Sequence, residues 1–471
     1  MRTLITNGLV VTADGSFEAD VLVVDESIEA VVGRDSGVAE GVLAGVTVDA
    51  TIDAAGKYVV PGGIDVHTHM ELPFGGTYAK DTFESGSKAA AHGGTTTILD
   101  FAAQTKGRPL REGLDAWHAR AEGKSVLDYG FHMMMADVND ATLAEMDQLV
   151  AEGVPDFKLF TAYPGVFYSP DDHIFRAMQR TRENGGLIMM HAENGPVIDV
   201  IAADLVAAGT TAPIGHGLAR YAVLEKEATS RAIYLAEAAG VPVYIVHLSS
   251  RDALEVVTDA RDRGAMAFAE TCPQYLFLSL DDLGNGFEGA KYVCSPPLRP
   301  KDHQEPLWRG LLKDDLQLVA TDHCPFDFHG QKELGREDFR KIPNGLPAVE
   351  DRVDLLHHGG VVQGRMSRER WVEIMATNPA KLFGMYPKKG AVAPGSDADL
   401  LVYDPNRVRT ISAATHHMDV DYSIFEGFEI QGTSDVVMSR GTVLVRDGEW
   451  VGPAGHGRFV RRGPADYVRL A

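Results

Sequence analysis

Cysteine is scarce in this chain of 471 residues. Only Cys272, Cys294 and Cys324 occur, and none of them belongs to a Cys-x-x-Cys pair. Such a small, odd set argues against a disulfide framework or a cysteine zinc site and favours a reducing compartment. The sequence also lacks an apolar run of membrane-spanning length, and its first residues lack the apolar core of a secretory signal. We therefore expect a cytoplasmic protein with no membrane partner.

Basic residues are outnumbered by acidic ones. Lys and Arg total 44 against 67 Asp and Glu, which gives a formal charge of −23 at pH 7. Such a charge repels polyanions and argues against nucleic acid or an anionic membrane as the main partner. Hydrophobic residues make up 45% of the chain, enough to bury a large core. A small neutral molecule fits better as the substrate.

The two ends of the chain resemble each other and differ from the middle. Both ends contain short alternating strands separated by Gly and Asp turns, whereas the middle repeats a strand followed by an amphipathic helix. Eight apolar strands are predicted in the middle, at residues 63–66, 95–101, 129–134, 156–160, 187–190, 243–246, 266–269 and 316–320. The pattern predicts an α/β fold in which a (β/α)8 TIM barrel, residues 58–387, is inserted in a small β-sandwich domain built from residues 1–57 and 388–471.

Helix start and stop signals support this alternation. In Asp81-Thr-Phe-Glu84 the aspartate is placed to cap a helix that runs to Gly93-Gly94. Similar signals predict helices over residues 171–185 and 225–240.

Two histidines end the first barrel strand. His67 and His69 are two residues apart, so their side chains point to the same face of an extended chain. A single His-x-His is common by chance, but His191, His247 and Asp322 follow at the ends of strands five, six and eight. A lone strand-end histidine can simply bind a carbonyl, and an aspartate can cap a helix. Their joint occurrence at the face where such barrels place their chemistry predicts a catalytic divalent-metal site.

Lys158 lies in the middle of the apolar fourth strand, Asp156-Phe-Lys-Leu-Phe. A buried ammonium is unfavourable, and burial lowers the pKa of a lysine and favours the neutral amine. From the residues alone two interpretations are open. The lysine pairs with Asp156 or another carboxylate, or its amine captures carbon dioxide and becomes a carbamate, N6-carboxylysine, that bridges two metals.

Eight segments together carry a more specific signal. They are Pro61-Gly-Gly-Ile-Asp-Val-His-Thr-His-Met-Glu-Leu-Pro-Phe, Gly93-Gly-Thr-Thr-Thr-Ile-Leu-Asp-Phe, Asp156-Phe-Lys-Leu-Phe, His191-Ala-Glu-Asn, Glu270-Thr-Cys-Pro-Gln-Tyr-Leu, Tyr292-Val-Cys-Ser-Pro-Pro-Leu-Arg, Thr321-Asp-His-Cys-Pro-Phe and Ile342-Pro-Asn-Gly. In these segments the chain resembles the D-hydantoinase and dihydropyrimidinase family of the amidohydrolase superfamily, from the first barrel strand to about residue 406.

The resemblance implies a site with two Zn²⁺ ions, or with Mn²⁺ or another divalent metal in their place. His67, His69 and Asp322 would bind one metal, His191 and His247 the other, and carboxylated Lys158 would bridge them. The family likeness also implies a homotetramer.

The same resemblance implies how the substrate is held and opened. Ser295 and Asn344 would bind a cyclic amide or imide through backbone groups, and Tyr163 would stabilise the developing oxyanion. A hydroxide bridging the metals would attack the carbonyl carbon while Asp322 acts as general base and then as general acid. The reaction would open a 5-substituted hydantoin or a dihydropyrimidine to an N-carbamoyl amino acid. Each residue also has a plain structural interpretation, as a loop anchor or part of a turn.

A few side chains help to distinguish this function from those of related enzymes. Dihydroorotase-like sequences carry an arginine two residues after the second histidine, where this chain has Glu71. Phe74, Phe160 and Phe167 follow strands one and four and suggest an apolar wall for a ring substituent, although aromatic residues near a loop are often plain packing. An allantoinase-like cyclic ureide hydrolase is an alternative. A non-catalytic protein similar to the collapsin-response mediators is disfavoured, because every ligand position is occupied.

Overall fold

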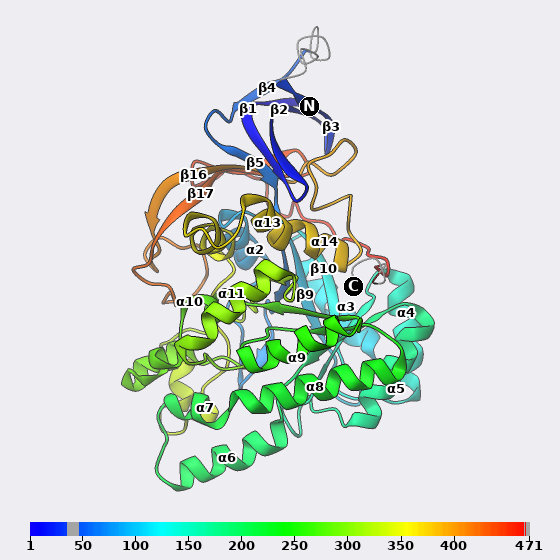
Figure 1. Ribbon diagram of the computed structural model, residues 1–471, viewed down its shortest axis with the longest axis vertical. Helices are drawn as coiled ribbons and strands as arrows, with labels where there is room; N and C mark the ends of the chain where they lie inside the picture. The colour runs from blue at the N-terminus through cyan, green and yellow to red at the C-terminus, as the bar shows by residue number, and fades with distance from the viewer. Residues whose placement is uncertain (35–46, 466, 468–471) are drawn as a thin grey trace.

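The computed structural model of the protein describes residues 1–34, 47–465 and 467. Eight parallel strands form a nearly closed barrel (Figure 1). They are β6 Gly63–Thr68, β9 Thr95–Ala103, β10 Asp128–Met134, β11 Asp156–Phe160, β12 Leu187–His191, β13 Val243–Ile245, β14 Ala267–Thr271 and β15 Leu318–Val319, paired in chain order from β6 to β15. A parallel bridge between Thr68 and His323 links the two ends of this path. The strands are almost completely buried, as expected of parallel strands covered on both faces.

Helices surround the barrel. They are α2 Phe83–His92, α3 Leu110–Ala121, α4 Asp140–Glu152, α5 Asp171–Asn184, α6 Gly195–Ala207, α7 Ile214–Ala219, α8 Ala222–Ala239, α9 Arg251–Asp262, α10 Pro273–Phe277, α11 Gln304–Lys313, α12 Arg352–Leu356, α13 Arg368–Val372 and α14 Asn378–Leu382. Among the described residues, no helix is both long and apolar enough to cross a membrane.

The predicted cap of α2 was wrong by one residue. Thr82, not Asp81, is the N-cap, and its side chain accepts a hydrogen bond from the backbone N–H of Ser85, whose side chain accepts one from the N–H of Thr82. Asp81 is buried instead, and its carboxylate lies 3.0 Å from Nε2 of His323. The side chain of Asp81, which the local sequence pattern assigned to the helix cap, therefore binds His323 at the barrel mouth.

Both chain termini contribute to a second sheet, which lies at one end of the molecule, opposite α6 (Figure 1). Its strands are β1 Arg2–Thr12, β2 Gly15–Val24, β3 Ser27–Gly33, β4 Ala50–Asp53, β5 Tyr58–Pro61, β16 Leu400–Thr410, β17 Glu429–Ser439, β18 Thr442–Arg446 and β19 Glu449–Trp450. β5 joins the two halves, because it pairs with β1 on one side and β16 on the other before the chain enters β6. The predicted architecture, a barrel with a β domain built from both termini, is confirmed.

A buried charge cluster fixes this β domain to the start of the barrel strands. The ammonium of Lys389 lies 2.8 Å from Asp128, which begins β10, 2.7 Å from Asp399 and 3.1 Å from Asp397. Arg440, between β17 and β18, lies 3.0 Å from the same Asp128. We call these five residues the floor cluster, because Asp128 stands at the amino end of its strand.

Candidate metal centre and active site

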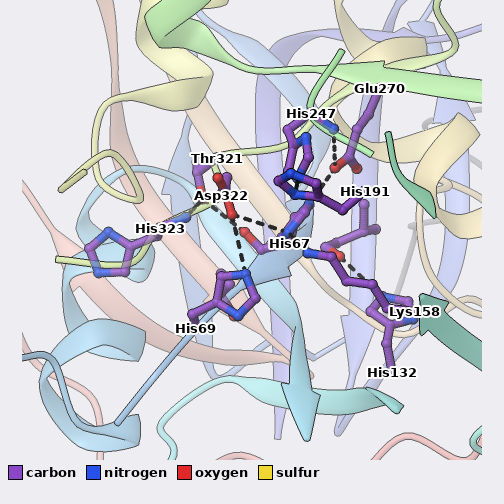
Figure 2. Close-up of polar contacts among 12 residues, drawn as sticks. His67, His69, His132, Lys158, His191, His247, Glu270, Thr321, Asp322 and His323 are labelled. Carbon is purple, nitrogen blue, oxygen red and sulfur yellow. Dashed lines mark hydrogen bonds and ion pairs between the residues drawn. The ribbon is translucent and has the colours of Figure 1, made fainter. Parts of the chain in front are cut away.

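The six predicted metal ligands converge at the carboxyl ends of the barrel strands (Figure 2). His67 belongs to β6, Lys158 to β11 and His191 to β12. His69, His247 and Asp322 lie one, two and three residues past the ends of β6, β13 and β15. The strand alternation that suggested His67 and His69 as a pair places both imidazoles beside one carboxylate. Nε2 of His67 lies 3.1 Å from Oδ1 of Asp322, and Nε2 of His69 lies 3.2 Å from the same oxygen.

The remaining donors continue the group on the other side of His67. Nζ of Lys158 lies 2.9 Å from Nε2 of His67, and Nδ1 of His191 lies 3.0 Å from Nε2 of His247. The rings of His67 and His247 have their centroids 5.4 Å apart. Histidines from separate strands therefore turn ring nitrogen atoms toward one another.

Three residues of this region have a left-handed backbone. The φ angles of Tyr163, His247 and Asp322 are 60°, 39° and 53°. Residues other than glycine adopt such angles infrequently. Those that do are concentrated at sites where function requires a side chain in a particular place. The backbone therefore supports the view that these side chains are positioned for function.

Electrostatics favour neutral imidazoles at His69, His191 and His247 and an ionised Asp322. His67 differs: burial and Lys158 lower its pKa, but Glu270 and Asp322 outweigh them and raise it above its ordinary value. Burial lowers the pKa of His69 to about 3 and that of His247 well below its usual value. Burial alone would raise the pKa of Asp322, but His67 and His69 hold it well below its ordinary range. Burial also lowers the pKa of Lys158 to about 8. Neutral imidazole and ionised carboxylate are the forms that bind metals.

The donor set fits a divalent cation. Within the described residues, His67, His69 and Asp322 each offer one ligand atom, and these atoms lie within 4.8 Å of one another. The Nδ1 atoms of His69 and His247 are buried without a hydrogen-bond partner. A buried polar atom without a partner is unfavourable, and a bound cation satisfies such nitrogens. The cluster therefore has the composition of a catalytic metal site with histidine and aspartate ligands.

Two buried glutamates orient the histidines. Glu270, at the end of β14, contacts Nδ1 of His67 and accepts hydrogen bonds from the hydroxyl of Tyr244 at 2.9 Å and the backbone N–H of His247 at 3.1 Å. Glu193 lies 2.9 Å from Nε2 of His191. Carboxylates of this kind fix the tautomer and orientation of ligand histidines. Sequence reasoning assigned them no role, although Glu270 ends the seventh strand and the strand-end rule could have found it.

Lys158 does not pair with Asp156. The carboxylate of Asp156 instead lies 2.9 Å from His132 and contacts Arg462, both of them buried. Nζ of Lys158 lies over the ring of Phe101, 4.2 Å from its centroid. Among the described residues no carboxylate is hydrogen-bonded to Lys158, so the ion-pair interpretation of this lysine has no support.

A pocket opens directly above the donors. It holds about 480 Å³ of empty space, counting the part open to solvent. Its lining includes the predicted substrate residues Phe74, Phe160, Tyr163, Phe167, Ser295 and Asn344, together with Leu72, Met134, Cys324 and Gly345, which sequence reasoning did not single out. All predicted site residues except His67, which lies beneath, line this one pocket.

The aromatic residues form one wall of this pocket. The rings of Phe160 and Phe167 are stacked with centroids 5.0 Å apart, and Phe74 meets Tyr163 edge to face at 5.6 Å. Burial raises the pKa of Tyr163, and hydrogen bonds with the side chains of Ser295 and Asn344 act in the opposite direction. Tyr163 therefore lies between the apolar wall and the polar end of the pocket as a neutral hydroxyl.

The polar end consists of two loop segments. Nδ2 of Asn344 donates to Oγ of Ser295 at 3.1 Å, so the two side chains are bonded to each other. Across the described part of the chain, the backbone N–H and C=O groups of both residues have no hydrogen-bond partner. Backbone donors and acceptors left unpaired beside a pocket are available to a ligand with amide groups.

Comparisons with known proteins agree with this site. Residues 58–444 match the amidohydrolase family. The chain is 59% identical to a D-hydantoinase of Streptomyces coelicolor, over 99% of both chains, and 50% identical to a D-hydantoinase of Geobacillus stearothermophilus, over 98% of this chain and 97% of the other. The crystal structure of a dihydropyrimidinase from Brevibacillus agri superposes with a TM-score of 0.96 at 47% identity, over 99% of both chains. The chain therefore belongs to the D-hydantoinase and dihydropyrimidinase family of the amidohydrolases.

Proposed function

We propose that the chain is a cyclic amidohydrolase that opens a 5-substituted hydantoin or a dihydropyrimidine ring to an N-carbamoyl amino acid. The observation that carries the proposal is the single pocket in which metal-binding donors, a neutral tyrosine hydroxyl and unpaired backbone amides face one another beneath an aromatic wall. Among the relatives compared, those named D-hydantoinase are up to 59% identical in sequence to this chain.

We further propose that the site holds two Zn²⁺ ions, or Mn²⁺ in their place. His67, His69 and Asp322 would hold one ion and His191 and His247 the other. Lys158, which lies 2.9 Å from His67 and is without a carboxylate partner among the described residues, would bridge them as N6-carboxylysine, because its carbamate is anionic and has two oxygens. When bound, such ions lower the pKa of water towards neutrality and polarise a carbonyl.

The chain's own residues would perform the remaining steps. Asp322 is ionised, and His67 and His69 both lie beside its Oδ1 atom. Its other carboxylate oxygen can therefore accept a proton from water, and Asp322 can later return this proton to the departing ring nitrogen. Tyr163 would donate a hydrogen bond to the oxygen on which negative charge develops. Backbone groups of Ser295 and Asn344 would orient the ring amide, while Phe74, Phe160 and Phe167 would hold a substituent and exclude water.

Location and assembly complete the proposal. The three cysteines are all buried and free, which suits a reducing cytoplasm. We propose a homotetramer, as the family likeness implies, with residues 58–387 as the catalytic domain and residues 1–57 and 388–471 as the β domain. Light scattering of the purified protein tests the assembly directly, and a mass other than four chains would reject it.

A substrate panel tests the function. Dihydrouracil, hydantoin, D- and L-5-phenylhydantoin, allantoin and dihydroorotate are each assayed with and without added zinc or manganese. We expect metal-dependent opening of the hydantoins or dihydrouracil and little turnover of dihydroorotate, because Glu71 has the wrong charge to pair with its carboxylate. Turnover of allantoin alone would reassign the substrate, and no turnover of any cyclic amide would reject the proposal.

A further inference from the structure

Lys332 is a fully buried lysine outside the metal cluster. It begins a short 3-10 helix, Lys332–Gly335, in the long loop between β15 and α12, and its side chain is 0% exposed. Within the described residues no carboxylate pairs with it. A buried ammonium without a counter-ion is expensive in free energy, so its retention requires an explanation.

Backbone carbonyls take the place of a counter-ion. Nζ of Lys332 donates to the carbonyl oxygens of Val293 at 3.0 Å, Pro343 at 2.7 Å and Gly345 at 2.8 Å. An ammonium has three N–H donors and therefore matches three acceptors, whereas a neutral amine has only two. The ring of Phe326, with its centroid 5.7 Å away, adds a cation–π contact. Burial lowers the pKa of Lys332 to about 7. The three carbonyls act in the opposite direction, because they accept hydrogen bonds from the charged form.

The three carbonyls belong to the two segments that form the polar end of the pocket. Pro343 and Gly345 flank Asn344, and Val293 lies two residues before Ser295. A backbone hydrogen bond from Gly345 to the carbonyl of Val293, 3.0 Å long, joins the same segments. Lys332 itself does not line the pocket. It therefore holds both segments and occupies the carbonyls next to Asn344, while the backbone groups of Asn344 itself stay unpaired.

We propose that Lys332 is a positioning residue that sets the distance and orientation between the backbone groups of Ser295 and Asn344, and so fixes the recognition of the amide of the ring. This inference rests on the proposed function, because it assumes that these two segments bind a cyclic amide. It assigns Lys332 no contact with substrate or metal. Its removal would loosen two segments that bind the ring equally in the ground state and in the transition state, an effect that raises KM more than it lowers kcat.

The test compares Lys332→Met, whose side chain is one atom shorter and has no donor, with Lys332→Gln, which has the length of methionine and keeps two N–H donors. We expect KM for the best substrate of the panel to rise about tenfold or more in Lys332→Met and less in Lys332→Gln, because small displacements of positioning groups have large effects. We expect kcat within about threefold of wild type and an unchanged metal content by elemental analysis. Hydrogen exchange should accelerate in peptides that cover residues 293–296 and 343–346.

Leu149→Ala is the control for a loss of stability alone. Leu149 is fully buried and belongs to α4, one of the helices that surround the barrel, and it does not line the pocket. The substitution should lower the melting temperature and leave KM unchanged. An unchanged KM in folded Lys332→Met overturns the inference, as does exchange that is unchanged in both peptides. If Lys332→Met does not fold, an unchanged KM in Lys332→Gln overturns it equally. A wild-type protein that opens no cyclic amide rejects the proposed function instead, so the two failures are distinguishable.

Discussion

The two ends of the barrel both bury a lysine among ionisable groups, but they do so in opposite ways. In the floor cluster, burial alone would lower the pKa of Lys389, but Asp399, Asp128 and Asp397 raise it above its ordinary value. At the mouth, burial lowers the pKa of Lys158 to about 8, and the imidazole of His67 is its hydrogen-bond partner. The floor has a carboxylate for each cation, whereas the mouth has nitrogen donors in surplus.

This difference separates structure from function. A buried charge that is fully paired joins two parts of the fold and requires no ligand. A buried group of histidines that leaves ring nitrogens without a hydrogen-bond partner is complete only when a cation joins it. The predictions below test this contrast, from the largest expected effect on activity to the smallest.

Asp322→Asn should have the largest effect. The amide cannot accept the proton from water, so we expect kcat to fall about a thousandfold or more. The fold should persist, since the asparagine has nearly the same shape, and circular dichroism with a melting curve would verify this. A near-normal kcat would remove the proposed role of Asp322 in proton transfer.

Lys158→Ala should remove bound metal together with activity. We expect kcat to fall at least about a hundredfold and the metal content to drop in parallel, because the bridging carbamate is lost. Short carboxylic acids should restore part of both, since they supply the missing oxygens. Elemental mass spectrometry and rates measured with and without acetate provide the readouts; full activity of the variant would reject the carbamate.

Glu270→Gln should act one step away from the metal. The amide cannot hold His67 as the carboxylate does, so we expect metal affinity to fall about 10- to 100-fold. Titration with zinc in the presence of a competing chelator would measure the shift. Rates at saturating metal should recover most of the wild-type value; failure to recover would mean that Glu270 does more than orient a ligand.

Phe74→Ala should affect only substrates with a bulky substituent. Loss of the ring removes part of the apolar wall, so we expect kcat/KM for 5-phenylhydantoin to fall about tenfold, with little change for unsubstituted hydantoin. Phe17→Ala, an exposed phenylalanine in β2, is the matched control. Equal losses on both substrates would mean that Phe74 supports the fold of the site and does not contact the substituent.

Lys389→Met should leave activity intact while it weakens the fold. Removal of the cation leaves buried carboxylates unpaired, so the free energy of unfolding should fall by about 3–5 kcal/mol. Metal content and kcat per folded molecule should match wild type. A loss of metal in this variant would contradict the separation between floor and mouth.

Much of this site could be predicted because, in a barrel, the order of the strands in the sequence determines where the residues at their ends lie. Once eight strands are recognised, the residues that end them must meet at one face, and His67, His191 and Asp322 do so. The prediction that Asp81 caps α2 was wrong because Asp81 binds His323, a partner 242 residues away that no local pattern indicates.

Lys332 marks the limit of such reasoning. Its three acceptors are backbone carbonyls 11, 13 and 39 residues away, and a carbonyl has no signature in the sequence. A lysine in a loop is normally exposed, so composition predicts a solvated side chain. Only the folded arrangement of two distant segments reveals that this one is buried and what it holds.

The metal content of active enzyme tests the central claim most directly. Purified protein is analysed by elemental mass spectrometry while its rate on the best substrate is measured before chelation, after chelation and after addition of zinc or manganese. We predict two divalent ions per chain, with activity lost as they are removed and regained as they return. Full turnover by protein that carries no stoichiometric divalent metal would contradict the account.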